Sequence, residues 1–124
     1  DQQLDALLAP DTAQAVEAVE EGLDDLESGR HERVLMATVQ AWDQSDLRAL
    51  ENHAAWCECT ETPLARAQMH RLLDERNPPM ARAIDQLHQQ GKRIFAAVGS
   101  LHMVGPQGLP ALLAKQGYTV QRLQ

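Results

Sequence analysis

The chain has 124 residues, of which 44% are hydrophobic, and a formal net charge of −7, which suits one folded domain with a modest core. An acidic protein repels phosphate backbones, so the composition excludes nucleic-acid binding through a broad basic surface. No apolar run in the sequence approaches the roughly 20 residues that cross a bilayer, and we expect no membrane span. Abundant Ala, Leu, Gln and Glu favour helices.

Residues 1–91 are predicted to be helical. Asp11 followed by Gln14 is typical of a capped helix start, and Gly29 can end that helix. Apolar residues at helical spacing predict the first two helices; they are Val16, Val19, Leu23 and Leu26, then Leu35, Val39 and Trp42. Ser45 or Asp46 can cap a third helix that runs toward Trp56.

Two further helix starts combine a capping side chain with a proline at the first helical position, at Thr62-Pro63 and at Asn77-Pro78. The second of these helices carries a stripe of Met80, Ile84 and Leu87, and Gly91 can end it.

The pattern changes in residues 92–124. Ile94-Phe95-Ala96-Ala97-Val98 is a short apolar run that predicts a buried strand, Pro106 opens a short helix, and residues 118–123 alternate like a second strand. We therefore expect an α/β fold over residues 1–124, in which a strand-helix-strand unit follows the helices. A buried parallel sheet needs more than two strands, so this unit is expected to belong to a larger mixed or parallel sheet flanked by helices.

Cys57 and Cys59 are separated by one residue, and their state stays open at this point. A disulfide across one residue closes a very small ring, while two free thiols at a helix end are equally compatible with the sequence. Two sulfurs alone do not complete a structural zinc site, which usually needs four ligands.

The segment Gly99-Ser100-Leu101-His102 leaves the predicted strand and leads toward a helix. Ligands bind in the crevice beyond the strand ends of open α/β sheets. Gly99 would let the backbone turn sharply or approach a ligand closely, and Gly105 would give the same freedom just before the helix. A neutral His102 could bind a metal or move a proton near neutral pH. The alternative is a loop histidine that hydrogen-bonds the backbone.

Arg76-Asn77 is the second candidate. Arg76 could hold a carboxylate, a phosphate or a developing oxyanion, and Asn77 could orient a substrate or hydrogen-bond the histidine loop. Their structural alternatives are a cation at a helix end for Arg76 and a helix cap for Asn77. His31, His53, His70 and His88 show no shared metal-ligand spacing, and neither a GxSxG nor an HExxH motif is present.

Residues 95–110 resemble the closing GxxH segment of the TraB/GumN (Tiki-type) family, and Leu73-Asp74-Glu75-Arg76-Asn77 resembles its Arg-Asn motif. The opening Gln2-Gln3-Leu4 is similar to a segment from the middle of that family. The resemblance implies that residues 1–124 are the carboxy-terminal part of a larger α/β domain with two GxxH motifs and an acidic residue near the first. Gly99 and His102 match the second GxxH, whereas the first GxxH and the acidic residue have no match here.

The resemblance implies a metal-dependent hydrolase that acts on peptides or other small molecules. His102 would be a ligand for Mn, Co or Zn, Arg76 would steady an oxyanion, and Asn77 would orient a partner. A catalytic metal usually needs about three protein ligands, so we expect these residues to act together with the missing amino-terminal half and to be inactive alone.

The alternative is a non-enzymatic protein that binds or sequesters a ligand or cofactor in the same crevice. Bacterial relatives imply a periplasmic or cell-envelope location and a link to polysaccharide biosynthesis. An unpaired sheet edge would also favour association between copies.

Overall fold

The computed structural model describes residues 11–123, so the Gln2-Gln3-Leu4 segment lies outside it. The chain divides into two compact units, Asp1–Leu72 and Leu73–Gln124, and each is described by itself. No helix in the described part of the chain is both long enough and apolar enough to span a membrane.

The first unit is a succession of helices, α2 (Thr12–Glu27), α3 (Arg30–Asp43), α4 (Leu47–Glu51), α5 (His53–Trp56) and α6 (Pro63–Met69), and a π-helical turn, η1 (His70–Asp74), follows α6. The helix starts predicted in this unit are confirmed, but the helix expected to run toward Trp56 is interrupted at Asn52. The Asp11 carboxylate accepts from the Gln14 N–H at 2.9 Å, Asp46 accepts from Ala49, and Thr62 accepts from the Ala65 N–H at 3.0 Å. Each cap satisfies a backbone N–H that the first turn leaves without an intrahelical partner.

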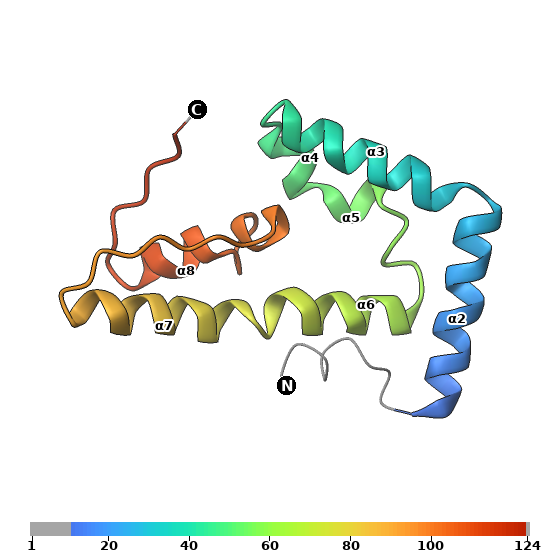
Figure 1. The fold of residues 1–124 in the computed structure, drawn as a ribbon, viewed down its shortest axis with the longest axis horizontal. Coiled ribbons are helices and arrows are strands. Elements are labelled where there is room, and N and C mark those ends of the chain that lie inside the picture. The colour runs from blue at the N-terminus through green and yellow to red at the C-terminus, as the bar shows by residue number, and fades with distance from the viewer. Residues whose placement is uncertain (1–10, 124) are drawn as a thin grey trace. The chain divides into compact units, whose positions relative to one another are not determined.

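The apolar stripes of α2 and α3 have the predicted spacing but remain open to solvent. Val16, Val19, Leu23 and Leu26 are between 52% and 64% exposed, and Leu35, Val39 and Trp42 are exposed as well. Figure 1 shows α2 and α3 meeting at a sharp bend, at Gly29. The buried side chains of this unit come instead from Ala41, Leu50, Cys57 and Leu64.

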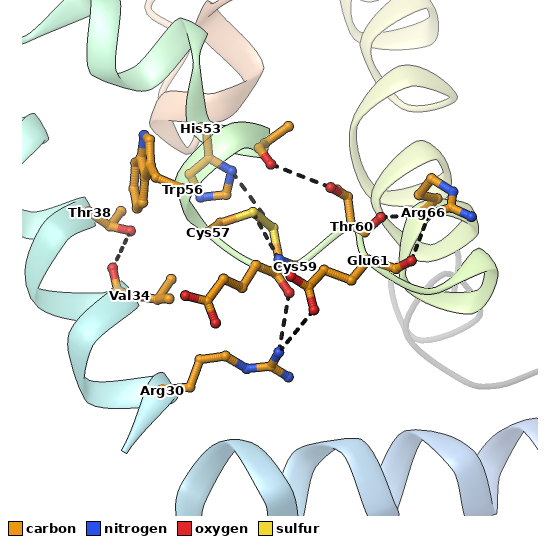
Figure 2. The surroundings of a disulfide bond; sticks show 12 residues. Arg30, Val34, Thr38, His53, Trp56, Cys57, Cys59, Thr60, Glu61 and Arg66 are labelled. Carbon is orange, nitrogen blue, oxygen red and sulfur yellow. Dashed lines mark hydrogen bonds and ion pairs between the residues drawn. A yellow bond between two sulfur atoms is a disulfide. The ribbon is translucent and has the colours of Figure 1, made fainter. Parts of the chain in front are cut away.

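Cys57 and Cys59 form a disulfide, which settles the question that the sequence left open. Figure 2 shows this bond beside His53, with Arg30 and Arg66 reaching the following loop from opposite sides. Cys57 is buried at the end of α5, and Cys59 is partly exposed.

The second unit contains α7 (Asn77–Gln89), the short 3-10 helix η2 (Ser100–Met103) and α8 (Leu109–Lys115). In Figure 1, α8 lies along α7, and these two helices make the most extensive contact between elements in the described chain. Ala81 of α7 and Leu109 of α8 are buried. The Tyr118 hydroxyl donates to the Asp85 carboxylate at 2.8 Å and ties the chain after α8 to α7.

The predicted α/β fold is wrong for the part of the chain that the structure describes. Residues 11–123 contain helices and no strand, and residues 94–98 and 118–123 are irregular instead. Phe95 is 94% exposed, and Ile94, Val98, Val120 and Leu123 are exposed too. A strand exists only when a neighbouring strand accepts and donates its backbone hydrogen bonds, and these apolar segments have no such neighbour among the described residues.

Candidate functional site

Asn77 is at the centre of the candidate site, which lies within the second unit. Its side chain is only 2% exposed, and its amide nitrogen donates to the Gln107 carbonyl at 2.8 Å. A carbonyl only accepts hydrogen bonds, so this contact fixes the amide orientation and turns Oδ1 toward His102. The predicted contact between Asn77 and the histidine loop is therefore present. The alternative role of Asn77 as a side-chain cap is not used, because α7 has no side-chain cap hydrogen bond.

His102 lies on η2, where its backbone N–H donates to the Gly99 carbonyl at 3.0 Å. Its Nδ1 is 2.6 Å from the Asn77 Oδ1. Because this oxygen only accepts, Nδ1 must carry the proton, and the lone pair of the neutral ring lies on Nε2. The site thus presents a histidine with a fixed tautomer and an Nε2 that can bind a cation or accept a proton.

Two effects favour the neutral ring. Burial lowers the pKa of His102, and the positive charge of Arg76 lowers it further, because both disfavour the imidazolium. Arg76 occupies the position just before α7, next to Asn77 in sequence, and its charge reaches the histidine. The structure therefore brings all four predicted site residues to one place: Asn77 and Gly99 each hydrogen-bond His102, and the charge of Arg76 acts on its ring.

Gly99 precedes η2, but its backbone does not need glycine. Its φ of −61° and ψ of 150° are ordinary extended values, and a Cβ there would meet His102 Cδ2 at 3.8 Å, an ordinary contact. The glycines with a structural requirement follow it. Gly105 has a φ of 77°, and a Cβ on Gly108 would lie 2.5 Å from the Val104 carbonyl oxygen.

Gln107 was not predictable from its residue type, because it enters the site through its backbone carbonyl and not through its side chain. The tight loop from Gly105 to Gly108 presents this carbonyl to Asn77. A close pair of glycines after a candidate histidine was the one available signal that the loop is shaped by contact with another element.

The described residues form no group of three or more potential metal ligands that includes His102. Within residues 11–123, three or more potential ligands come together only at His53, Cys57 and Cys59, which lie in the other unit. The geometry of His102 suits one metal ligand. Its Nδ1–H is held by Asn77, which leaves the Nε2 lone pair for a cation, as is common for histidines in metal sites.

The sequence model of the TraB/PrgY/gumN family matches residues 1–122. No match was found among curated proteins or among solved structures. The match extends across the Arg76-Asn77 pair and the Gly99–His102 segment that meet in the structure. The chain therefore belongs to the TraB/PrgY/gumN family.

Proposed function

We propose that this chain carries part of the active site of a metal-dependent hydrolase that acts on peptide bonds, with His102 as a metal ligand. The observation that supports this function best is the hydrogen bond from His102 Nδ1 to the buried Asn77. Histidines that bind metals usually donate their other ring N–H to a fixed acceptor, which orients the ring and selects its tautomer. Membership in the TraB/PrgY/gumN family is consistent with this role.

The proposed site needs ligands beyond His102. Catalytic metal sites usually have about three protein ligands and an open position, and residues 11–123 form no group of three potential ligands around His102. The other ligands would have to come from residues that the structure does not describe or from another chain. The 124 residues alone are therefore expected to bind a catalytic metal weakly and to lack turnover.

A divalent cation at such a site would polarise a peptide carbonyl and lower the pKa of a bound water. Asn77 acts as a positioning residue, because it holds the imidazole plane while its amide is held by Gln107. Burial and, to a smaller extent, the charge of Arg76 lower the pKa of His102 and favour the neutral ring that a metal ligand requires. The planar guanidinium of Arg76 can also bind a substrate carboxylate or a developing oxyanion.

The test is calorimetric titration of Mn²⁺, Co²⁺ and Zn²⁺ into the natural protein that contains this chain, with Cys57 and Cys59 oxidised. We expect binding to be lost in His102→Ala and to be weakened about 10- to 100-fold in Asn77→Ala, the usual effect of removing a second-shell partner. His88→Ala is the matched control, because His88 is an exposed histidine of the same unit. Unchanged affinity in His102→Ala would refute the ligand assignment.

A screen with fluorogenic peptides separates the hydrolase from the alternative ligand-binding protein. Metal-dependent cleavage that disappears in both His102→Ala and Arg76→Ala would support the hydrolase. Peptide that is retained by the protein but recovered intact after long incubation would contradict it and favour a binding role.

A further inference from the structure

His53, Cys57 and Cys59 form a cluster in the first unit that the proposed function does not use. One ligand atom from each residue lies within 4.8 Å of the others. His53 Nδ1 is 3.9 Å from Cys59 Sγ, and the Cys59 N–H donates to Cys57 Sγ at 3.1 Å. Figure 2 shows the imidazole of His53 facing the disulfide. A nitrogen and two sulfurs are the donor set that thiophilic cations prefer.

The loop that follows the cluster is held by contacts that do not depend on the disulfide. Arg30 of α3 donates to the Glu58 carbonyl at 3.5 Å and pairs with the Glu61 carboxylate at 3.8 Å. Arg66 of α6 donates to the carbonyls of Thr60 and Glu61, both at 2.8 Å. These bonds tie the residues on both sides of Cys59 to α3 and α6, and the Thr60 hydroxyl donates to the Ala54 carbonyl of α5 at 3.5 Å. The loop therefore has contacts that would hold Cys59 near His53 without the disulfide.

His53 is also held in place from its own helix. Its ring packs edge-to-face on Trp56 with the centroids 4.7 Å apart, and the Trp56 indole N–H donates to the Ala49 carbonyl at 2.9 Å. A ligand whose ring is already oriented loses little side-chain entropy when it binds a cation.

A purely stabilising role is a poor explanation for this disulfide. It joins residues that are two apart in sequence, and a cross-link constrains the unfolded chain least when its loop is shortest. Glu58, between the two cysteines, has a φ of 53°, which is unfavourable for any residue with a side chain. The cysteines are therefore held together at a conformational cost, with little stability in return.

We propose that His53, Cys57 and Cys59 form a redox-gated Zn²⁺ site, closed while the disulfide is present and opened when a dithiol reduces it. In the reduction, the dithiol gives two electrons and two protons and becomes a disulfide itself, and Cys57 and Cys59 become thiols. When Zn²⁺ binds, each thiol releases one proton to solvent, and His53 contributes a nitrogen lone pair.

The geometry needs little rearrangement. In a tetrahedral zinc site, Zn–S bonds of about 2.3 Å put two sulfurs about 3.7 Å apart and a sulfur and a nitrogen about 3.5 Å apart. The Cys59 Sγ to His53 Nδ1 distance of 3.9 Å is already close to this value. After reduction, rotation of the two cysteine side chains can move the sulfur atoms apart to this spacing. The backbone N–H of Cys59 then stabilises the charge on the Cys57 thiolate.

A cation can reach the cluster from a cleft of about 400 Å³ that both cysteines line. Four acidic residues share this lining, Glu21, Asp25, Glu58 and Glu61, together with Arg30 and His31. The excess of carboxylates favours a cation over an anion. With three protein ligands, a fourth zinc position would remain for a water molecule.

The test titrates Co²⁺, and then Zn²⁺, into the 124-residue chain under anaerobic conditions, before and after reduction by a dithiol that is removed by gel filtration. We expect the reduced chain to bind one Co²⁺ with thiolate-to-cobalt charge-transfer absorbance, and Zn²⁺ to displace it. The oxidised chain should show no such absorbance. Equal binding by the oxidised and reduced chains, or no absorbance in the reduced chain, would overturn the proposal.

Variants identify the ligands. Cys57→Ser and Cys59→Ser should each abolish the charge-transfer band, and His53→Gln should weaken binding at least roughly tenfold, since loss of a second-shell contact alone has that effect. His31→Gln, an exposed histidine of the same cleft, should leave binding unchanged. Full affinity in His53→Gln would overturn the three-ligand site. His102→Ala should leave this binding intact, so the test is independent of the proposed hydrolase.

Circular dichroism of the reduced wild-type chain without metal provides the folding control. A helical signal equal to that of the oxidised chain is expected, because the arginine contacts hold the loop in both states. Loss of that signal on reduction would contradict a preformed site.

Discussion

The apolar stripe of α2 lies mostly open to solvent, whereas α7 and α8 bury Ala81 and Leu109 against each other. Both regions have helical sequence patterns with apolar residues three and four apart, and both form helices. The difference is that α8 returns along α7, while α2 has no comparable partner among the described residues. Amphipathic spacing thus determines that a helix forms, and packing against another element determines whether its apolar side contributes to stability.

The largest difference in the free energy of unfolding should come from replacing one leucine by alanine in each region. Leu109 is 3% exposed and Leu23 is 53% exposed. We expect Leu109→Ala to lower the free energy of unfolding by about 2–5 kcal/mol, because it leaves a cavity, and Leu23→Ala to change it by about 0.5 kcal/mol or less. Residue-resolved hydrogen exchange measures the free energy of local unfolding in each unit separately, so it can report the two losses independently. Equal losses would show that α2 is covered by a partner, for example another copy of the chain.

Replacing one glycine by alanine in each region should change the stability of the two regions in opposite directions. A Cβ on Gly108 would overlap the Val104 backbone, while a Cβ on Gly22, in the middle of α2, meets nothing within 4 Å. Gly108→Ala should destabilise its unit by about 1–3 kcal/mol. Gly22→Ala should stabilise α2 by about 0.5–1 kcal/mol, because alanine restricts the unfolded chain. Urea denaturation followed by circular dichroism tests both signs, and a stabilising Gly108→Ala would disprove the tight loop.

Asn77 connects the packing of the second unit to the candidate site. Asn77→Ala removes both amide contacts and leaves the Gln107 carbonyl and the His102 ring without this partner. We expect a loss of about 1–3 kcal/mol, the usual cost of leaving buried polar groups unpaired. Thr62→Ala is the matched control in the first unit, where the side chain only caps α6, and it should cost about 1 kcal/mol. A smaller loss in Asn77→Ala than in Thr62→Ala would contradict the central position of the amide.

The smallest effect should be the pH dependence that His102 gives to the second unit. Burial and Arg76 lower the pKa of His102 from its ordinary value of 6.5, so the unfolded chain takes up a proton more readily than the folded chain. At pH values above 6.5, His102 should not affect the free energy of unfolding. As the pH is lowered through 6.5, the free energy of unfolding should fall. An NMR titration of the ring should give a pKa below 6.5, and Arg76→Gln should raise it. A wild-type pKa above 6.5 would contradict the site geometry.

Only part of the candidate site could be predicted from the sequence. Asn77 was predicted either to orient a substrate or to hydrogen-bond the histidine loop, and the structure brings Asn77 and His102, 25 positions apart, into contact. The carbonyl of Gln107 was not predictable, because a backbone group leaves no signature in the residue type. Gly99 does not make the sharp turn that its residue type allows, whereas the freedom predicted for Gly105 is used at a φ of 77°. The constraint on Gly108 arises from a contact with Val104, which only the folded loop creates.

Local chemistry in the sequence determined the helices and their ends. Asp11, Asp46 and Thr62 cap helices where predicted, because a cap depends on residues within a single turn. Which apolar segments are buried, and that residues 94–98 and 118–123 form no strand, became clear only from the folded chain. A strand needs hydrogen-bond partners and a core needs a second surface, and both come from groups that are distant in sequence.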